Sequence, residues 1–183
     1  MTTITTASGL SIDLFSPATA SITIHDIAEH LSKLCRFTGA CRPFWSVGQH
    51  SLLVSRLCHP DAALAGLLHD ASEAFLGDVS SPLKHSPMMA GYRELEAEWE
   101  QAIGKAFGLD LWRHHEEVKS ADQAAFKLEH AGLLGWESSD GEVTRAWAAA
   151  RSFLPEMGLM EMDRDKVRGL FVREFEKLKA GAP

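Results

Sequence analysis

The sequence predicts an all-α protein that carries a short extended arm at its N-terminus. From residue 24 onward, apolar residues recur every three or four positions, as in helices that bury one face in a core. Glycines, prolines and N-capping residues separate these apolar segments, as is typical of helix ends. Residues 1–22 are instead rich in Thr, Ser and Ala, and weak alternation over 10–14 and 21–24 predicts an extended arm or a small hairpin.

The helices are expected in a regular order along the rest of the chain. They are predicted over 24–34, 47–57, from after Asp61 to about Phe75, and over 87–106, 118–134, 142–153 and 163–179. Ser46 is the expected N-cap of the second helix, and Gly77 and Gly108 are expected to end the third and fourth. Loops are predicted over 35–45, 80–84 and 136–141.

Length and composition indicate one domain built around a single core. The chain has 183 residues, of which 45% are hydrophobic, and this is enough to bury a sizeable core. We expect the arm to span residues 1–23 and the helical domain to span residues 24–183. The net charge of −7 argues against a nucleic-acid partner, because nucleic-acid-binding proteins normally present a basic face.

The cysteines and the N-terminal residues indicate a reduced, cytoplasmic setting. Cys35, Cys41 and Cys58 are too few and too scattered for a disulfide framework, and no Cys-x-x-Cys pair suggests a structural zinc site. The first residues lack the basic region and apolar core of a signal peptide. No apolar run approaches the roughly 20 residues that cross a bilayer, so we expect no membrane partner.

A dense polar cluster over residues 69–78 is the strongest functional signal in the sequence. It contains His69, Asp70, Glu73 and Asp78, and it directly follows the apolar, helix-forming run 62–68. Burying several charges together costs free energy unless they are paired or hold a metal. The cluster therefore predicts a site for a divalent cation.

Two residues from other predicted helices extend this candidate site. His50 and Asp122, together with His69 and Asp70, supply the imidazole and carboxylate donors that bind divalent metals. Spacing alone leaves other interpretations open. Taken alone, His50 is more typical of a core histidine. Asp122 is also typical of a charge favoured by a helix N-terminus, and Glu73 of a solvated helix residue.

The order of these residues resembles that of the HD-domain metal-dependent phosphohydrolases, whose pattern is a His, a His-Asp pair and a later Asp on a separate helix. The segments 69–84 and 118–122 are similar to the branch that contains bacterial 5′-deoxynucleotidases. The segments 26–39 and 45–51 are similar to small phage and prophage proteins, which include triphosphohydrolases that remove dATP. The resemblance covers about residues 24–134 and implies a compact HD-domain helical bundle.

The resemblance implies a division of labour within the site. His50, His69, Asp70 and Asp122 would hold the metal. Glu73 would orient or deprotonate the attacking water, and Asp78 would contact the substrate or assist the leaving group.

Four further residues are expected to contact the substrate. Arg36 and Lys84 would supply cations for phosphate, although both are also typical of surface residues. Trp45 would stack on a nucleobase, with core packing or loop anchoring as the alternative. Phe37 stands where the deoxynucleotidase branch has a Trp, which leaves open how a 2′-hydroxyl would be rejected.

Four other tryptophans are expected in the core or at an interface. These are Trp99, Trp112, Trp136 and Trp147. The neighbouring pair His114-His115 is expected in a solvated loop beside Trp112.

The expected activity is hydrolysis of phosphate esters of small deoxynucleotides, as a 5′-deoxynucleotidase or a triphosphohydrolase. The expected cofactor is one or two divalent ions of Mn, Co, Fe, Zn, Ni or Mg, and the resemblance implies a homo-oligomer, a dimer or larger.

One alternative function is that of a non-catalytic or regulatory nucleotide-binding protein. This alternative predicts loss of a metal ligand or of Glu73, and the sequence retains all of them. Another is a phosphodiesterase acting on a signalling nucleotide. Its cyclic-dinucleotide form would carry a Gly-Tyr-Pro signature that this chain lacks.

Overall fold

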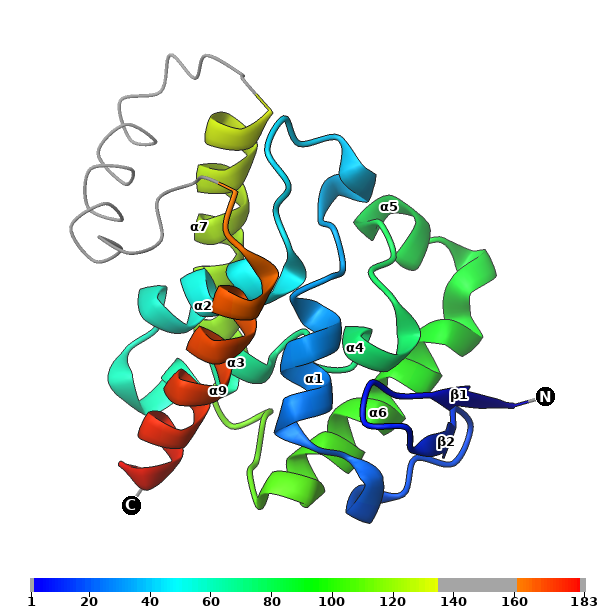
Figure 1. The fold of residues 1–183 in the computed structure, drawn as a ribbon. Helices are drawn as coiled ribbons and strands as arrows, with labels where there is room; N and C mark the ends of the chain where they lie inside the picture. The colour runs from blue at the N-terminus through cyan, green and yellow to red at the C-terminus, as the bar shows by residue number, and fades with distance from the viewer. Residues whose placement is uncertain (1, 135–160, 182–183) are drawn as a thin grey trace.

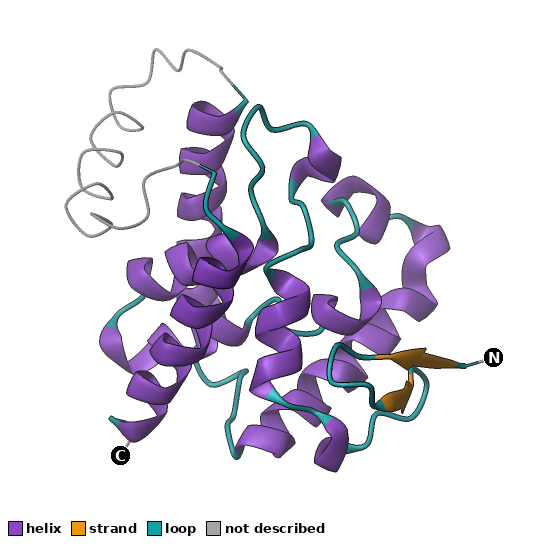
Figure 2. Cartoon of the chain, viewed as in Figure 1, coloured by secondary structure: helices purple, strands orange, loops and turns teal. Residues whose placement is uncertain are grey.

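The computed structural model describes residues 2–134 and 161–181, and over these residues the fold is the expected all-α type (Figure 1, Figure 2). The helices are α1 (Ile24–Leu31), α2 (Val47–Leu57), α3 (Ala63–Leu68), α4 (Glu73–Leu76), α5 (Ser81–Lys84), α6 (Ala90–Phe107), α7 (His115–Leu133) and α9 (Arg164–Ala180). None of these helices is long and apolar enough to span a bilayer. The loop expected at 136–141 and the helix expected at 142–153 lie outside the described residues.

The N-terminal arm is a hairpin docked onto the helical domain. Strands β1 (Thr3–Thr5) and β2 (Ser11–Asp13) pair antiparallel, so the alternative of a small hairpin is confirmed. The extended segment expected at 21–24 is wrong, because the partner of β2 is β1, a 3-10 turn covers Thr19–Ser21 and α1 begins at Ile24. The Asp26 carboxylate in α1 accepts hydrogen bonds from the backbone N–H and the hydroxyl of Ser8, both at 2.8 Å. Ile12 is buried in the main core. The arm is therefore held by both a polar anchor and an apolar contact.

Helix α2 is buried along almost its whole length, and α1, α3, α7 and α9 pack against it. Ser46 is its N-cap, as expected. The Ser46 hydroxyl accepts the backbone N–H of Gln49 at 3.1 Å, and the Gln49 side chain accepts the backbone N–H of Ser46 at 3.2 Å. This capping box satisfies two donors that would otherwise be unpaired at a buried helix start.

A glycine in α3 allows that helix to approach α2 closely. A Cβ atom on Gly66 would lie 2.7 Å from Sγ of Cys58 and 3.3 Å from Cα of Ser55. Because α2 and α3 pack this tightly, His50 from α2 and His69 from the end of α3 come together, with ring centroids 5.2 Å apart.

The prediction of one continuous helix from after Asp61 to Phe75 is wrong, because this segment forms two helices with a break between them. Helix α3 ends at Leu68 and α4 begins at Glu73. Between them, the N–H groups of Ala71 and Glu73 donate to carbonyls three residues earlier, each at 3.0 Å. The apolar pattern does not distinguish this tighter turn from a regular helix, and such turns often mark functional segments. Gly77, at φ 83°, ends α4 as expected.

The remaining elements follow the sequence with small differences. Residues 81–84 form the one-turn helix α5 rather than a loop, and α7 begins at His115 rather than near Val118. Gly108 ends α6 in the left-handed conformation, as expected. Trp99 in α6 is fully buried, as expected, and its indole donates to the carbonyl of Leu14 at 2.9 Å, which attaches the arm to this helix.

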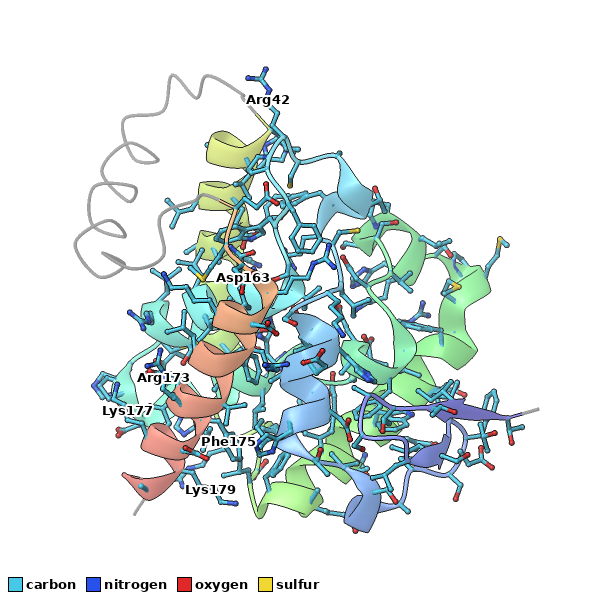
Figure 3. All side chains as sticks on the ribbon, in the orientation of Figure 1. Arg42, Asp163, Arg173, Phe175, Lys177 and Lys179 are labelled. Atoms are coloured by element: carbon cyan, nitrogen blue, oxygen red, sulfur yellow. The ribbon has the colours of Figure 1, made fainter. Side chains whose placement is uncertain are left out.

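Helix α9 closes one side of the core beside α1 (Figure 1). Asp163 caps it, as its carboxylate accepts two backbone N–H groups of the first turn at 3.0 and 3.1 Å. Near the other end of α9, the Lys179 ammonium lies over the rings of Phe175 and Phe107, at 5.5 and 5.7 Å from their centroids (Figure 3). The expectation of a C-terminal helix over 163–179 is confirmed.

Replacing Gly66 tests the close contact between α2 and α3. We expect Gly66→Ala to lower the free energy of unfolding by about 1–3 kcal/mol, because the new methyl overpacks against α2. The measurement is urea unfolding of the wild type and the variant. Gly169→Ala in α9 is the matched control, since its Cβ meets nothing within 4 Å and removing a mid-helix glycine stabilises by about 0.5–1 kcal/mol. Equal effects of the two substitutions would contradict the packing argument.

Candidate metal centre

Two imidazoles and a carboxylate from three separate segments meet at one point. His50 comes from α2, His69 from the turn after α3, and Asp122 from α7. One donor atom of each residue lies within 4.8 Å of the other two. Nε2 of His50 is 3.0 Å from Oδ1 of Asp122, and Nε2 of His69 is 3.9 Å from the same oxygen. Donor atoms this close can share one ion, so the three residues can hold a metal.

Asp70, the fourth ligand that the resemblance implied, lies at the same point. Its Oδ2 is 3.1 Å from Nε2 of His69 and 3.5 Å from Nε2 of His50. Burial alone would raise the pKa of Asp70, but the two imidazoles and Arg36 hold that pKa well below its usual range. The carboxylate therefore stays ionised. We call His50, His69, Asp70 and Asp122 the ligand cluster.

The second nitrogen of each imidazole is held by an acceptor outside the cluster. Nδ1 of His50 lies 2.8 Å from Oε1 of Glu129, and Nδ1 of His69 lies 2.8 Å from the carbonyl oxygen of Gly66. These acceptors require a proton on Nδ1, so a neutral ring presents the lone pair of Nε2 to the cluster. Both rings are thus oriented as metal-binding histidines are.

Carboxylate oxygens lie 3.0 Å from Nε2 of His50 and 3.1 Å from Nε2 of His69, but in a neutral ring with its proton on Nδ1 neither Nε2 atom can donate a hydrogen bond to them. Nε2 of His50 and Nε2 of His69 are buried and form no hydrogen bond with the described part of the chain. A buried polar atom without a partner costs roughly 1–3 kcal/mol, and coordination of a cation would satisfy both nitrogens. The residues present therefore fit the divalent ion that the resemblance implies.

The electrostatic surroundings of the cluster also favour positive charge. Burial alone would lower the pKa of His50, but the neighbouring carboxylates of Glu129 and Asp122 outweigh it and raise the pKa to about 9. Asp122 itself has a lowered pKa despite its burial, because His50 and His69 favour its ionised form. A cation at this point is stabilised by the same carboxylates.

Glu129 is a site residue that the sequence analysis missed. It is fully buried on α7, and its carboxylate accepts hydrogen bonds from Nε1 of Trp45 at 2.9 Å and Nε of Arg36 at 3.1 Å, besides contacting His50. Burial would raise its pKa, yet His50 and Arg36 lower it. Glu129 lies two helical turns after Asp122 and so shares its face, which is the one signal in the sequence that could have identified it.

Arg36 lies beside the ligand cluster with its side chain 13% exposed. Its Nη1 is 3.7 Å from Oδ2 of Asp70, while its Nε is bonded to Glu129. Burial would lower the pKa of Arg36, but these acidic neighbours raise it, so the guanidinium remains charged. Its expected contact with phosphate stays a prediction.

The two aromatic residues expected at the substrate differ in their surroundings. Trp45 is 1% exposed, so the expectation that it stacks on a nucleobase is wrong; the alternative of loop anchoring is correct, since its indole is bonded to Glu129. Phe37 is half-buried, with its ring 5.8 Å from that of Phe126 and its backbone at φ 54°, in the left-handed region. Its contact with substrate stays a prediction.

Glu73 is buried at the start of α4, and Lys84 reaches it from α5. Nζ of Lys84 lies 3.5 Å from Oε1 of Glu73 and 2.7 Å from Oε1 of Glu96, so Lys84 is held between two carboxylates. Oε2 of Glu73 is buried and forms no hydrogen bond with the described residues. Burial, reinforced by Asp70 and Asp78, raises the pKa of Glu73 well above its usual value. Burial likewise raises the pKa of Asp78.

Removing Glu129 tests its role as the anchor of this site. We expect Glu129→Ala to lower the free energy of unfolding by about 3–5 kcal/mol, because it leaves the buried charge of Arg36 without its partner. Urea unfolding measures the change. Glu129→Gln keeps the size and one acceptor oxygen, so a smaller loss is expected. A loss below about 1 kcal/mol in Glu129→Ala would show that the buried network does not depend on this carboxylate.

The chain is similar to two bacterial proteins over most of its length. It is 37% identical over 157 residues to a protein of Escherichia coli (strain K12) described as the uncharacterized protein YfdR, which covers 86% of this chain and 84% of that protein. It is 33% identical over 147 residues to an uncharacterized protein of Rhodobacter capsulatus, with 74% of each chain covered. No model of a known protein family matches the chain.

Proposed function

We propose that this chain, which belongs to the same family as YfdR of Escherichia coli, is a metal-dependent phosphohydrolase of the HD-domain type that acts on small deoxynucleotides. One observation carries the proposal: the Nε2 atoms of His50 and His69 converge, without hydrogen bonds among the described residues, on the carboxylates of Asp70 and Asp122. Glu73 adds a buried carboxylate, and burial together with the charge of Asp70 raises its pKa, which supports a role as the base.

The ligand cluster would hold the cofactor. A divalent ion there supplies positive charge that stabilises phosphoryl oxygens and lowers the pKa of bound water. Two imidazole nitrogens and two carboxylates suit Mn²⁺, Co²⁺, Fe²⁺, Ni²⁺ or Zn²⁺. Mg²⁺ would bind the carboxylate oxygens more readily than the imidazole nitrogens.

Hydrolysis forms a bond from a water oxygen to phosphorus and breaks the bond from phosphorus to the 5′-oxygen of the sugar. Glu73 accepts the proton that the water loses, and its raised pKa makes it a stronger base than an exposed carboxylate. Asp78, whose pKa is also raised, donates a proton to the leaving oxygen. A monophosphate yields a deoxynucleoside and phosphate, and a triphosphate yields a deoxynucleoside and tripolyphosphate.

Arg36 would bind the phosphate from a fixed position. Its Nε is held by Glu129, so the guanidinium does not have to be ordered when substrate arrives. Lys84 would contribute in two ways, because it lies beside Glu73 as well as near the site. Its ammonium keeps the Glu73 carboxylate in place and adds positive charge for the phosphate oxygens.

A substrate panel tests the proposed activity. The full chain is loaded with Mn²⁺, Co²⁺, Zn²⁺ or Mg²⁺ and incubated with deoxynucleoside monophosphates, deoxynucleoside triphosphates and the matching ribonucleotides. We expect release of a deoxynucleoside with phosphate or tripolyphosphate, and loss of this activity with EDTA. If no member of the panel is hydrolysed while elemental analysis shows bound metal, the proposal is overturned.

Replacing Glu73 separates the chemical step from metal binding. We expect Glu73→Gln to lower kcat by about 100-fold or more, since general-base catalysis is worth roughly 10²–10⁴-fold, while the bound metal measured by elemental analysis stays unchanged. Glu98→Gln is the control, because Glu98 is exposed on α6 and lies outside the site. Loss of the metal in Glu73→Gln would instead identify Glu73 as a ligand.

A further inference from the structure

A small cavity of about 60 Å³ lies next to the ligand cluster, between α6 and the start of α7. The His69 side chain forms part of its wall, so the cavity adjoins the metal centre through this shared residue. The cavity is also lined by Glu100, Trp112 and His115, and Leu111 and Val118 add apolar surface. None of the residues that the sequence predicted at the substrate lines this cavity.

Trp112 and His115 form an aromatic platform at the cavity. Their rings are stacked, with centroids 4.8 Å apart and planes at 21°. Trp112 is nevertheless 53% exposed, so of the two expected places, core or interface, the core is excluded and the interface stays a prediction. Because one face of the indole lies on His115, the exposed surface belongs to its other face and its edge. A solvent-exposed indole face is a surface on which a flat heterocycle stacks.

Glu100 supplies a polar group at the same cavity. It is half-buried and forms no hydrogen bond or ion pair with the described residues, in contrast to Glu96 one turn earlier, which is paired with Lys84. Burial, followed by the charge of Glu96, raises the pKa of Glu100 to about 7. A carboxylate of this kind is poorly solvated and gains from a hydrogen-bond donor on a ligand.

We propose that this cavity is the subsite for the nucleobase of the substrate, with the ring stacked on Trp112 and an exocyclic amino group donating to Glu100. The inference rests on the proposed function, because the phosphate of the same molecule would lie at the ligand cluster. His69 borders both sites, so the proposed base and phosphate positions adjoin through this one side chain. The cavity is too small for a whole nucleotide. In the proposed pose only the edge of the base enters the cavity, while the face of the base stacks on the indole of Trp112.

The decisive test compares ligands with and without a base. Wild type, Trp112→Ala and Trp112→Phe are assayed with 2′-deoxyadenosine 5′-monophosphate and with 2-deoxyribose 5-phosphate, which lacks the base. Because stacking contributes roughly tenfold or more per base, we expect Trp112→Ala to raise KM for the nucleotide about tenfold. The kinetics of the base-free ester should change less than twofold. Trp112→Phe, which retains a ring, should stay close to wild type.

A binding measurement keeps this inference distinguishable from the proposed activity. Titration calorimetry with 2′-deoxyadenosine requires neither phosphate nor turnover, and we expect Trp112→Ala to weaken its binding about tenfold. Phe15→Ala is the control, since Phe15 is 65% exposed in the N-terminal arm. If nucleotides are not hydrolysed but nucleoside binding still depends on Trp112, the activity fails and the subsite stands.

Other results would overturn the subsite. The first is failure of the wild type to bind the nucleoside, and the second is an equal effect of Trp112→Ala on both esters. The third is a lower molecular mass of Trp112→Ala than of the wild type in light scattering, which would identify Trp112 as a contact between copies.

The role of Glu100 is tested with 2′-deoxyinosine, which carries a carbonyl in place of the amino group. We expect weaker binding of deoxyinosine in the wild type and no difference in Glu100→Ala. Equal binding of the two nucleosides by the wild type would overturn this role.

Discussion

The buried carboxylate of Glu129 is the interaction on which the rest of the site depends. It contacts Nδ1 of His50, the indole of Trp45 and the guanidinium of Arg36, and it is fully buried. A buried ion is stable only when its hydrogen bonds are satisfied, and here the three donors come from α2 and the segment preceding it. Fixing this one carboxylate therefore fixes the ring of His50 in α2, the guanidinium of Arg36 and the indole of Trp45 in the segment before α2.

The second constraint is the close packing of α2 against α3. Gly66 has two roles. Its lack of a side chain lets α2 pack closely, and its carbonyl oxygen accepts a hydrogen bond from Nδ1 of His69. The tight turn that follows places His69 and Asp70 side by side at the cluster. Gly66 thus sets both the packing of α3 on α2 and the orientation of the His69 ring. The site therefore stays well defined although the helix is interrupted between α3 and α4.

The sequence predicted the features that depend on local chemistry and failed where distant contacts decide. The capped start of α2 at Ser46 and the glycine end of α6 at Gly108 follow from rules for helix ends, and both are confirmed. The interruption between α3 and α4 was missed, since apolar periodicity is unchanged by it. For Trp45 the sequence left stacking on a base and anchoring of the loop both open, because the partner that decides between them, Glu129, is distant in the sequence. The donor types of His50, His69 and Asp122 suggested their convergence, and the order of the HD-domain motif that they resemble favoured it over the other interpretations.

The charges around the ligand cluster show why a phosphate substrate, as proposed, would need a cation besides those of the chain. Asp70, Asp122 and Glu129 stay ionised through their contacts with imidazoles and Arg36. Lys84 is largely offset by Glu96 and Glu73. Phosphate would thus approach a region in which carboxylates outnumber unpaired cations, and like charges at short range repel strongly in a poorly solvated site. Only an added cation at the cluster reverses this balance, so metal binding and phosphate binding are expected to be coupled in this fold.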